Sequence, residues 1–204
     1  MAIDVWLQAL PDEVPLPVVL RDDPEAAESL SFISQWLVHD RAAPDKLAAL
    51  PGGGTDVVWE WCCMLGGRYP GIHEWSCSLG RDWDHLHYLL SATRREQPPA
   101  PDDSHLEYLF NKAPMVARST CGFPVRLIDS IKTKELHAWL EVLSVADLAT
   151  HYDSTHIEKV AVYKHNPDAS PVETLRYLEE VFERFRAFVR GAAARGNQIL
   201  MRKD

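Results

Sequence analysis

The spacing of apolar side chains predicts a series of short strands and helices, with a long helix near the C-terminus. At the start, apolar and more polar residues alternate over residues 3–9, and this two-residue period is typical of a strand. Near the end, apolar residues recur at steps of three and four over residues 175–189, so they share one face of a helix. Gly196 ends this helix, and residues 198–201 predict a final edge strand.

Capping signals indicate where several helices begin. The stretch Ser170-Pro171-Val172-Glu173 combines an N-cap serine, a proline at the first helical position and a capping-box glutamate. Ser144 and Asp147 form a second capping-box pair, and Asp153 is placed as the N-cap of a short helix after it. Thr133 can cap the helix that precedes Ser144.

The middle of the chain is less clearly patterned. Residues 57–65 are apolar and fit a buried strand or a helix, and their periodicity does not decide between the two. Residues 97–103, QPPAPDD, are the strongest linker candidate, and residues 159–163 predict a short strand. The elements together predict one α+β domain over residues 1–204, with a small, mostly antiparallel sheet packed against several helices.

The charge balance restricts the possible partners. With 30 acidic and 21 basic residues, the formal net charge is −9. A nucleic-acid-binding protein needs a cationic surface that displaces phosphate counterions, so this composition argues against nucleic acid. No stretch of about 18 consecutive apolar residues occurs, so no membrane helix is predicted. The early Asp4 and the absence of a basic start argue against a signal peptide, so we expect a cytoplasmic protein.

Four cysteines carry no metal or redox signature, because none forms a C-x-x-C pair. They are Cys62, Cys63, Cys77 and Cys121. Adjacent cysteines rarely bridge each other, and reduced thiols are the simplest interpretation for a protein of the cytoplasm.

One stretch, RDWDHLHYLLS at residues 81–91, concentrates carboxylate and imidazole side chains. On a helix of about 3.6 residues per turn, Trp83 and His87 share the apolar face, and Asp84 flanks His87. His85 points away from His87 in this projection, toward solvent. One helix therefore offers at most two converging ligands, where a closed zinc site needs about four. We expect no metal and no cofactor.

The inward-facing His87 has two interpretations. In the first, it is a core histidine whose ring nitrogens bond a carbonyl or a carboxylate such as Asp84. In the second, it is a general acid or base that Asp84 orients in a cleft, with Trp83 and Arg126 as candidate binding residues. We favour the first, because no nucleophile motif such as G-x-S-x-G accompanies the pair.

Seven tryptophans are the remaining unusual feature. Trp59, Trp61 and Trp75 lie in a segment rich in tryptophan and cysteine, at about residues 36–80. Aromatic side chains bury large areas at small entropic cost and are enriched at binding surfaces. These three residues are therefore candidates for a partner surface, beside the alternative of plain core packing.

The residues that suggest a family fall in three places. They are Trp83-x-x-Leu86-His87-Tyr88-Leu89-Leu90, then Pro124-Val125-Arg126 with Leu136, Leu140, Leu148, Tyr152-Asp153 and Val162-Tyr163, and last Phe182, Phe185, Phe188 and Gly196. Together they resemble the YfbM-like family of bacterial proteins, a domain of unknown function. The resemblance covers roughly residues 80–203, and the segment at about 36–80 departs from it. It implies a compact α+β domain in a bacterial cytoplasm, and it brings no established reaction or catalytic residues.

Two hypotheses for function follow. The leading one is a non-enzymatic protein-binding module, because the sequence offers an acidic surface and a tryptophan-rich segment but no converging catalytic set. An immunity-type role, by analogy with domains encoded beside toxins, is one form of this hypothesis. The alternative is a small-molecule-binding protein or hydrolase that uses Asp84 and His87 in a cleft. The oligomeric state is left open.

Overall fold

The computed structural model describes residues 3–27, 53–91, 105–119, 122–163 and 165–203. In this part of the chain, five strands form one sheet in the order β2-β1-β5-β4-β3, and every neighbouring pair is antiparallel. The strands are β1 (Val5–Pro11), β2 (Ser76–Gly80), β3 (Met115–Arg118), β4 (Pro124–Ile128) and β5 (Asn197–Lys203). The predicted α+β class with an antiparallel sheet is confirmed.

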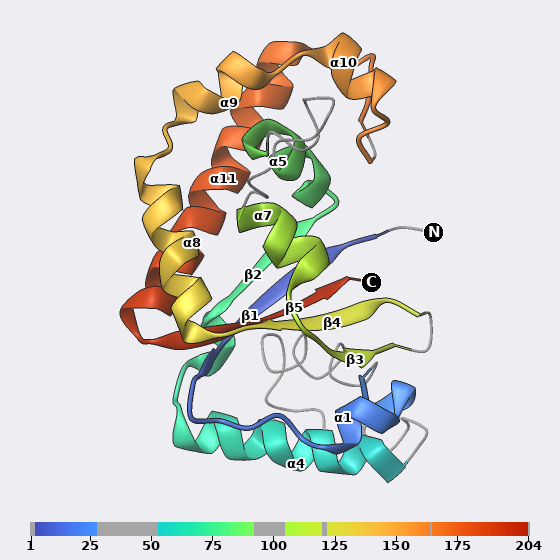
Figure 1. Cartoon of the computed structure of the whole chain (residues 1–204), viewed down its shortest axis with the longest axis vertical. Helices are drawn as coiled ribbons and strands as arrows, with labels where there is room; N and C mark the ends of the chain where they lie inside the picture. The colour runs from blue at the N-terminus through green and yellow to red at the C-terminus, as the bar shows by residue number, and fades with distance from the viewer. Residues whose placement is uncertain (1–2, 28–52, 92–104, 120–121, 164, 204) are drawn as a thin grey trace.

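Helices cover both faces of this sheet (Figure 1). The upper face in Figure 1 carries α5 (Trp83–Leu90), α7 (His105–Glu107), the π-helical turn η2 (Tyr108–Lys112), α8 (Ser130–Val142), α9 (Val145–His151), α10 (Ser154–Lys159) and α11 (Pro171–Ala194). The lower side carries α1 (Val19–Asp22), α4 (Gly53–Arg68) and the 3-10 turn η1 (Ile72–Glu74). Each face has its own apolar cluster, which we call the upper and the lower cluster.

The first strand confirms the alternation seen in the sequence. Val5, Leu7 and Ala9 are fully buried in the upper cluster, whereas Leu10 belongs to the lower cluster. Successive side chains of a strand point to opposite faces, so one strand contributes to both helical layers.

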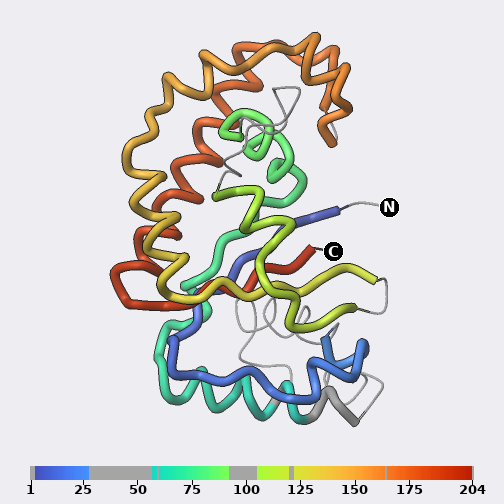
Figure 2. The backbone as a smooth tube through the Cα atoms, in the orientation of Figure 1, coloured from blue at the N-terminus to red at the C-terminus, as the bar shows by residue number. Residues whose placement is uncertain are grey.

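The last strand does not lie at an edge of the sheet, and the prediction of an edge strand is wrong in this respect. β5 pairs with β1 on one side and with β4 on the other, and β1 and β5 run side by side through the middle of the molecule (Figure 2). All seven of its residues are buried. Ile199 and Met201 face the upper cluster and Leu200 faces the lower one, so the continuous apolar run suits a strand covered on both faces.

The long C-terminal helix has the predicted extent. α11 begins at Pro171, directly after Ser170, and its buried face includes Phe182, Phe185 and Val189. The predicted Ser170 cap is only partly confirmed, because the serine occupies the N-cap position but its side chain makes no cap hydrogen bond. Beyond the helix, Gly196 has a φ of +69°, a left-handed conformation that glycine adopts without steric cost.

The shorter helices of the upper layer are capped largely as predicted. The Asp147 carboxylate accepts a hydrogen bond of 2.6 Å from the backbone of Ser144, and Asp153 accepts one of 3.0 Å from the backbone of His156. The prediction for Thr133 is wrong, because Asp129 caps α8 by accepting a hydrogen bond of 2.8 Å from Lys132 N.

Two further expectations are resolved in the described part of the chain, and one lies outside it. Residues 57–65 belong to a helix, α4, rather than to a strand. Residues 159–163 do not form the predicted strand, because α10 runs through Lys159 and a turn follows it. The linker candidate at residues 97–103 lies outside the described residues.

The described cysteines are free thiols, namely Cys62, Cys63 and Cys77. Burial raises the pKa of Cys62 and raises the pKa of Cys77 to about 11, so both thiols are protonated and unreactive at neutral pH. Cys121 lies outside the described residues.

Helix α5 is buried on every side, which the helical projection does not predict. It contacts α7, α9 and α11, and all eight of its residues are buried. His85 is 7% exposed, so the expectation that it faces solvent is wrong. Its Nε2 lies 3.5 Å from Nδ1 of His165. His165 belongs to the segment that follows α10 in the chain. Burial lowers the pKa of His85, and the charge of His165 lowers it further, while Asp82 and Asp84 oppose the shift.

We expect the N-caps of α8 and α11 to differ in how much their substitution lowers the stability of the fold. Asp129→Ala should lower the free energy of unfolding by about 1 kcal/mol, because the Lys132 N–H loses its cap acceptor. Ser170→Ala should change it by less than about 0.5 kcal/mol, since this hydroxyl makes no cap hydrogen bond. Urea denaturation measures both, and equal losses for the two variants would contradict this assignment.

We also expect His85 to make the fold sensitive to acid. Because the pKa of His85 is lowered in the folded state, the unfolded chain takes up this proton at a higher pH. The contribution of neutral His85 is complete above the ordinary pKa of about 6.5 and is lost as the pH falls below it.

The urea midpoint should therefore fall between about pH 7.5 and about pH 5.5, and it should fall less in His85→Gln. His73→Gln is the control, because His73 lies in η1 on the lower side of the sheet. A pH dependence as steep in His85→Gln as in the wild type would show that His85 is not responsible.

Candidate functional site

The candidate acid–base pair lies inside the upper layer. Asp84 and His87 are each 2% exposed. Nδ1 of His87 lies 3.9 Å from Oδ1 of Asp84, and its Nε2 lies 3.0 Å from Oε2 of Glu107 in α7. The imidazole therefore lies between two carboxylates, which form ion pairs with it when it is protonated. Oδ2 of Asp84 also accepts a hydrogen bond of 2.8 Å from the backbone of Tyr163, in the segment after α10.

This buried set ties elements together. Asp84 joins α5 to the segment after α10, and His87 joins α5 to α7. The His87 ring also packs edge-on against Phe110, with centroids 6.0 Å apart. A general acid or base must come within hydrogen-bond reach of its substrate, and neither side chain of the pair has an exposed edge to offer. His87 is thus buried, but neither of its ring nitrogens makes a hydrogen bond within the described part of the chain, so the carbonyl or carboxylate bond expected of a core histidine is not seen.

Sequence reasoning did not find Glu107. It lies 20 residues after His87, beyond the proline-rich linker candidate, and no short spacing connects the two. Only the packing of α7 against α5 brings them together.

Trp83 and Arg126 have roles of their own in the fold. The Trp83 indole N–H donates a hydrogen bond of 3.2 Å to Ile3 O, and Lys203 Nζ lies 4.1 Å from the centroid of its ring. Arg126 donates a hydrogen bond of 2.6 Å to Ala113 O and so holds the end of η2 to β4. Burial lowers the pKa of Arg126, and the charge of Arg118 lowers it further.

Of the tryptophan-rich segment, the part over residues 53–74 is described in α4, η1 and the turn between them, on the lower side of the sheet. The Trp61 indole N–H donates a hydrogen bond of 3.1 Å to Pro15 O, which fastens the chain after β1 to α4. Trp75 packs against both clusters, and the Arg195 guanidinium lies 4.5 Å from the centroid of its ring. Both tryptophans are half-buried and make contacts within the fold. Trp59 lies in α4, and its side chain is outside the described part.

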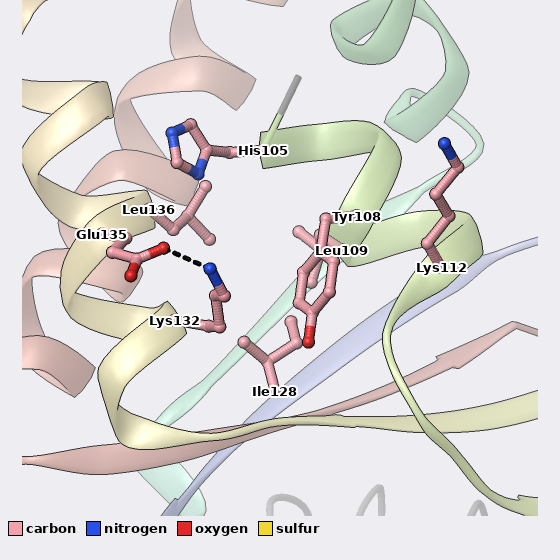
Figure 3. Close-up of a pocket in the computed structure, with 8 residues that line it drawn as sticks. All are labelled: His105, Tyr108, Leu109, Lys112, Ile128, Lys132, Glu135 and Leu136. Atoms are coloured by element: carbon pink, nitrogen blue, oxygen red, sulfur yellow. Dashed lines mark hydrogen bonds and ion pairs between the residues drawn. The ribbon is translucent and has the colours of Figure 1, made fainter. Parts of the chain in front are cut away.

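A pocket opens between η2, α8 and β4 (Figure 3). Its volume is about 190 Å³. Its lining consists of His105, Tyr108, Leu109, Lys112, Ile128, Lys132, Glu135 and Leu136. The π-helical turn forms one wall, and its wider hydrogen bond runs from Ala113 N to Tyr108 O at 2.7 Å. Such π-helical turns occur frequently at functional sites.

Polar groups surround an apolar base in this pocket. Leu109, Ile128 and Leu136 are almost fully buried. On the α8 wall, Lys132 Nζ donates a hydrogen bond of 2.6 Å to Oε2 of Glu135. The same ammonium lies 5.8 Å from the ring centroid of Tyr108, which forms the opposite wall.

Two titratable side chains of the pocket, Lys132 and His105, have pKa values shifted in opposite directions. The hydrogen bond to Glu135 raises the pKa of Lys132, so its ammonium remains charged. Burial lowers the pKa of His105, and Lys132 lowers it too, while Glu135 opposes the shift. His105 is therefore a neutral imidazole at pH 7, and its ring lies beside Trp139 with centroids 5.4 Å apart.

The sequence did not point to this pocket, because its residues come from four elements and share no motif. His105 comes from α7, Tyr108, Leu109 and Lys112 from η2, Ile128 from β4, and Lys132, Glu135 and Leu136 from α8. No other sequence pattern marks them. The π-helical turn is the signal that the structure adds.

Within residues 3–27, 53–91, 105–119, 122–163 and 165–203, no three His, Cys, Asp or Glu side chains converge on a position for a metal ion. Among the helices described, none combines the length and the apolar character needed to cross a membrane.

Comparison with known proteins places the chain in a family. The family model described as "Domain of unknown function (DUF1877)" matches residues 66–202. The crystal structure of YfbM from Escherichia coli, a protein of unknown function, is similar with a TM-score of 0.52 and 12% identity, over 98% of this chain and 99% of that chain. At this identity the likeness concerns the fold alone, and no curated protein matches the chain significantly. Because the family match spans more than half of the sequence, the chain belongs to the DUF1877 family, a domain of unknown function.

Proposed function

We propose that the protein is a binding protein without catalytic activity, and that it holds a small ligand between η2 and α8. The observation that carries this proposal is the pocket of about 190 Å³, with its buried apolar base and its few polar groups at the sides. Sites for small molecules commonly have this form, in which apolar surface gives affinity and placed polar groups fix orientation.

The position of the reactive side chains supports binding rather than catalysis. Asp84 and His87, the pair on which a hydrolase hypothesis rests, are buried among other side chains. The described lining of the pocket contains no serine, threonine or cysteine that would act as a nucleophile. Its Lys132 is held in the charged form by Glu135, and a charged ammonium is not a nucleophile.

A screen of small monocyclic fragments against the methyl-labelled protein tests this proposal. We expect some fragments to shift the NMR signals of the Ile128, Leu109 and Leu136 methyl groups, which lie at the base of the pocket. Lys132→Trp should abolish these shifts, because an indole at this position obstructs the pocket. Lys134→Trp is the matched control, since Lys134 is exposed on the same helix and does not line the pocket.

Two outcomes would contradict the proposal. If no fragment shifts the base methyl groups, the pocket is not a ligand site. If a bound fragment is chemically converted over hours in the sample, and Lys132→Trp stops the conversion, the protein is an enzyme.

A protein partner is the second candidate, and the outer face of α4 favours it. Val57 and Met64 are 46% and 43% exposed, although both are apolar. Glu60 and Arg68 lie four residues before and after Met64 on the same exposed ridge. In an antiparallel pairing of two α4 helices about Met64, Glu60 of each copy would face Arg68 of the other. This self-complementary charge pattern fits a second copy of the chain as the partner.

Light scattering at high protein concentration tests the second candidate. We expect a mass of two chains of 23.1 kDa each, and a mass of one chain for Met64→Glu, which places a charge at the centre of the contact. Val142→Glu is the control, because Val142 is 79% exposed at the end of α8 and should leave the mass unchanged. A wild-type monomer at every concentration would exclude this dimer.

A further inference from the structure

The size of the pocket limits the ligand. An engineered apolar cavity of about 150 Å³ in another protein accommodates one benzene molecule. With about 190 Å³, the pocket between η2 and α8 has room for one six-membered ring and a small substituent. A nucleotide or an oligosaccharide is too large to enter it as a whole.

The base of the pocket requires an apolar ligand body. Leu109, Ile128 and Leu136 form it, and none of their side chains offers a hydrogen bond. A sugar ring placed here would lose the hydration of its hydroxyl groups without replacement, and each such group costs free energy. The facing ring of Tyr108 adds an aromatic surface on which a flat hydrocarbon packs well.

The positive charge of Lys132 at the wall of the pocket favours a ligand with an anionic end, such as a carboxylate. Lys132 has three N–H donors, of which one goes to Glu135, so two are left to bind a carboxylate. The Lys132 side chain is 43% exposed, which leaves its ammonium reachable from the opening. Lys112 also lines the pocket, but Figure 3 shows its ammonium directed away from Lys132.

Glu135 limits the charge that the ligand can carry. Its carboxylate lies 2.6 Å from Lys132 Nζ, so any anion bound by this ammonium also lies close to a negative charge. The pair of Lys132 and Glu135 has no net charge, so it offsets little of the hydration that an anion loses on binding. This hydration cost is much larger for a dianion such as phosphate than for a monocarboxylate, which favours the monoanion. A neutral ligand would leave the two remaining donors of Lys132 to water.

We infer that the pocket binds a small monocarboxylate with a single ring or a similarly compact hydrocarbon body. The body lies on Leu109, Ile128 and Leu136 beside the Tyr108 ring, and the carboxylate accepts hydrogen bonds from Lys132 Nζ. This inference rests on the proposed ligand-binding function and names the chemical class of its ligand.

Titration of the full-length, methyl-labelled protein with three probes tests the inference. The probes are benzoate, its neutral isostere benzamide, and inorganic phosphate. We expect benzoate to shift the Ile128 and Leu136 methyl signals and to bind at least about tenfold more tightly than benzamide, because a charge-assisted hydrogen bond is worth at least that factor. Phosphate should leave these signals unchanged.

Substitution of the lysine separates the carboxylate contact from the rest of the pocket. Lys132→Met keeps the aliphatic stem and removes the charge, so benzoate should bind about tenfold more weakly, while benzamide should be little affected. Lys134→Met, on the exposed side of α8, should leave both affinities unchanged. Unfolding of a variant is detected in the same spectra, because methyl groups of the lower cluster such as Leu20 would shift as well.

The possible results distinguish the inference from the function on which it rests. If benzamide binds as well as benzoate, or if Lys132→Met leaves benzoate binding intact, the monocarboxylate class is wrong while the pocket is still a ligand site. Binding of phosphate that depends on Lys132 would likewise overturn the class. If no probe and no fragment of the wider screen shifts the base methyl groups, the proposed function itself fails.

Discussion

The two halves of the sheet do not pair with each other directly, and β5 joins them. One half consists of β2 and β1, the other of β4 and β3, and the final strand of the chain hydrogen-bonds to β1 on one side and to β4 on the other. Its backbone donors and acceptors are buried, and buried backbone groups must be paired. The upper and lower helical layers both depend on this pairing, because Ile199 and Met201 support one and Leu200 the other.

Burial of ionisable side chains organises the upper layer above this sheet. Asp84 and His87 lose hydration when they are buried, and nearby groups inside the protein offset part of this cost. Glu107 from α7 and the backbone of Tyr163 supply such partners. These contacts hold α5 against α7 and against the segment after α10.

The turn formed by α7 and η2 connects this buried set to the pocket. Glu107 reaches inward to His87, while His105 and Tyr108, two residues before and one after it, line the pocket. The π-helical hydrogen bond from Ala113 to Tyr108 widens the turn, and Arg126 holds its end to the sheet. The wall of the pocket is thus fixed from behind by the core, which favours a preformed site over one that orders on binding.

Local patterns in the sequence determined the elements whose formation is decided within a few residues. The alternation in β1, the apolar face of α11 and the caps at Ser144 and Asp153 follow from side-chain periodicity and from short hydrogen bonds to nearby backbone. The same local signals, read together, were enough to indicate the family.

Only the tertiary structure decided which elements become neighbours. The position of a strand at the end of the chain does not determine its neighbours in the sheet, so β5 was predicted as an edge strand. The continuous apolar run at residues 199–201 was the sequence feature that indicates a strand covered on both faces. A helical projection predicts one buried face for α5, but contacts on all sides bury His85 as well. The position of Glu107 beside His87 and the formation of the pocket depend on contacts between segments far apart in the sequence. Side-chain volume and charge compensation determine this packing, and the spacing of residues along the chain does not reveal it.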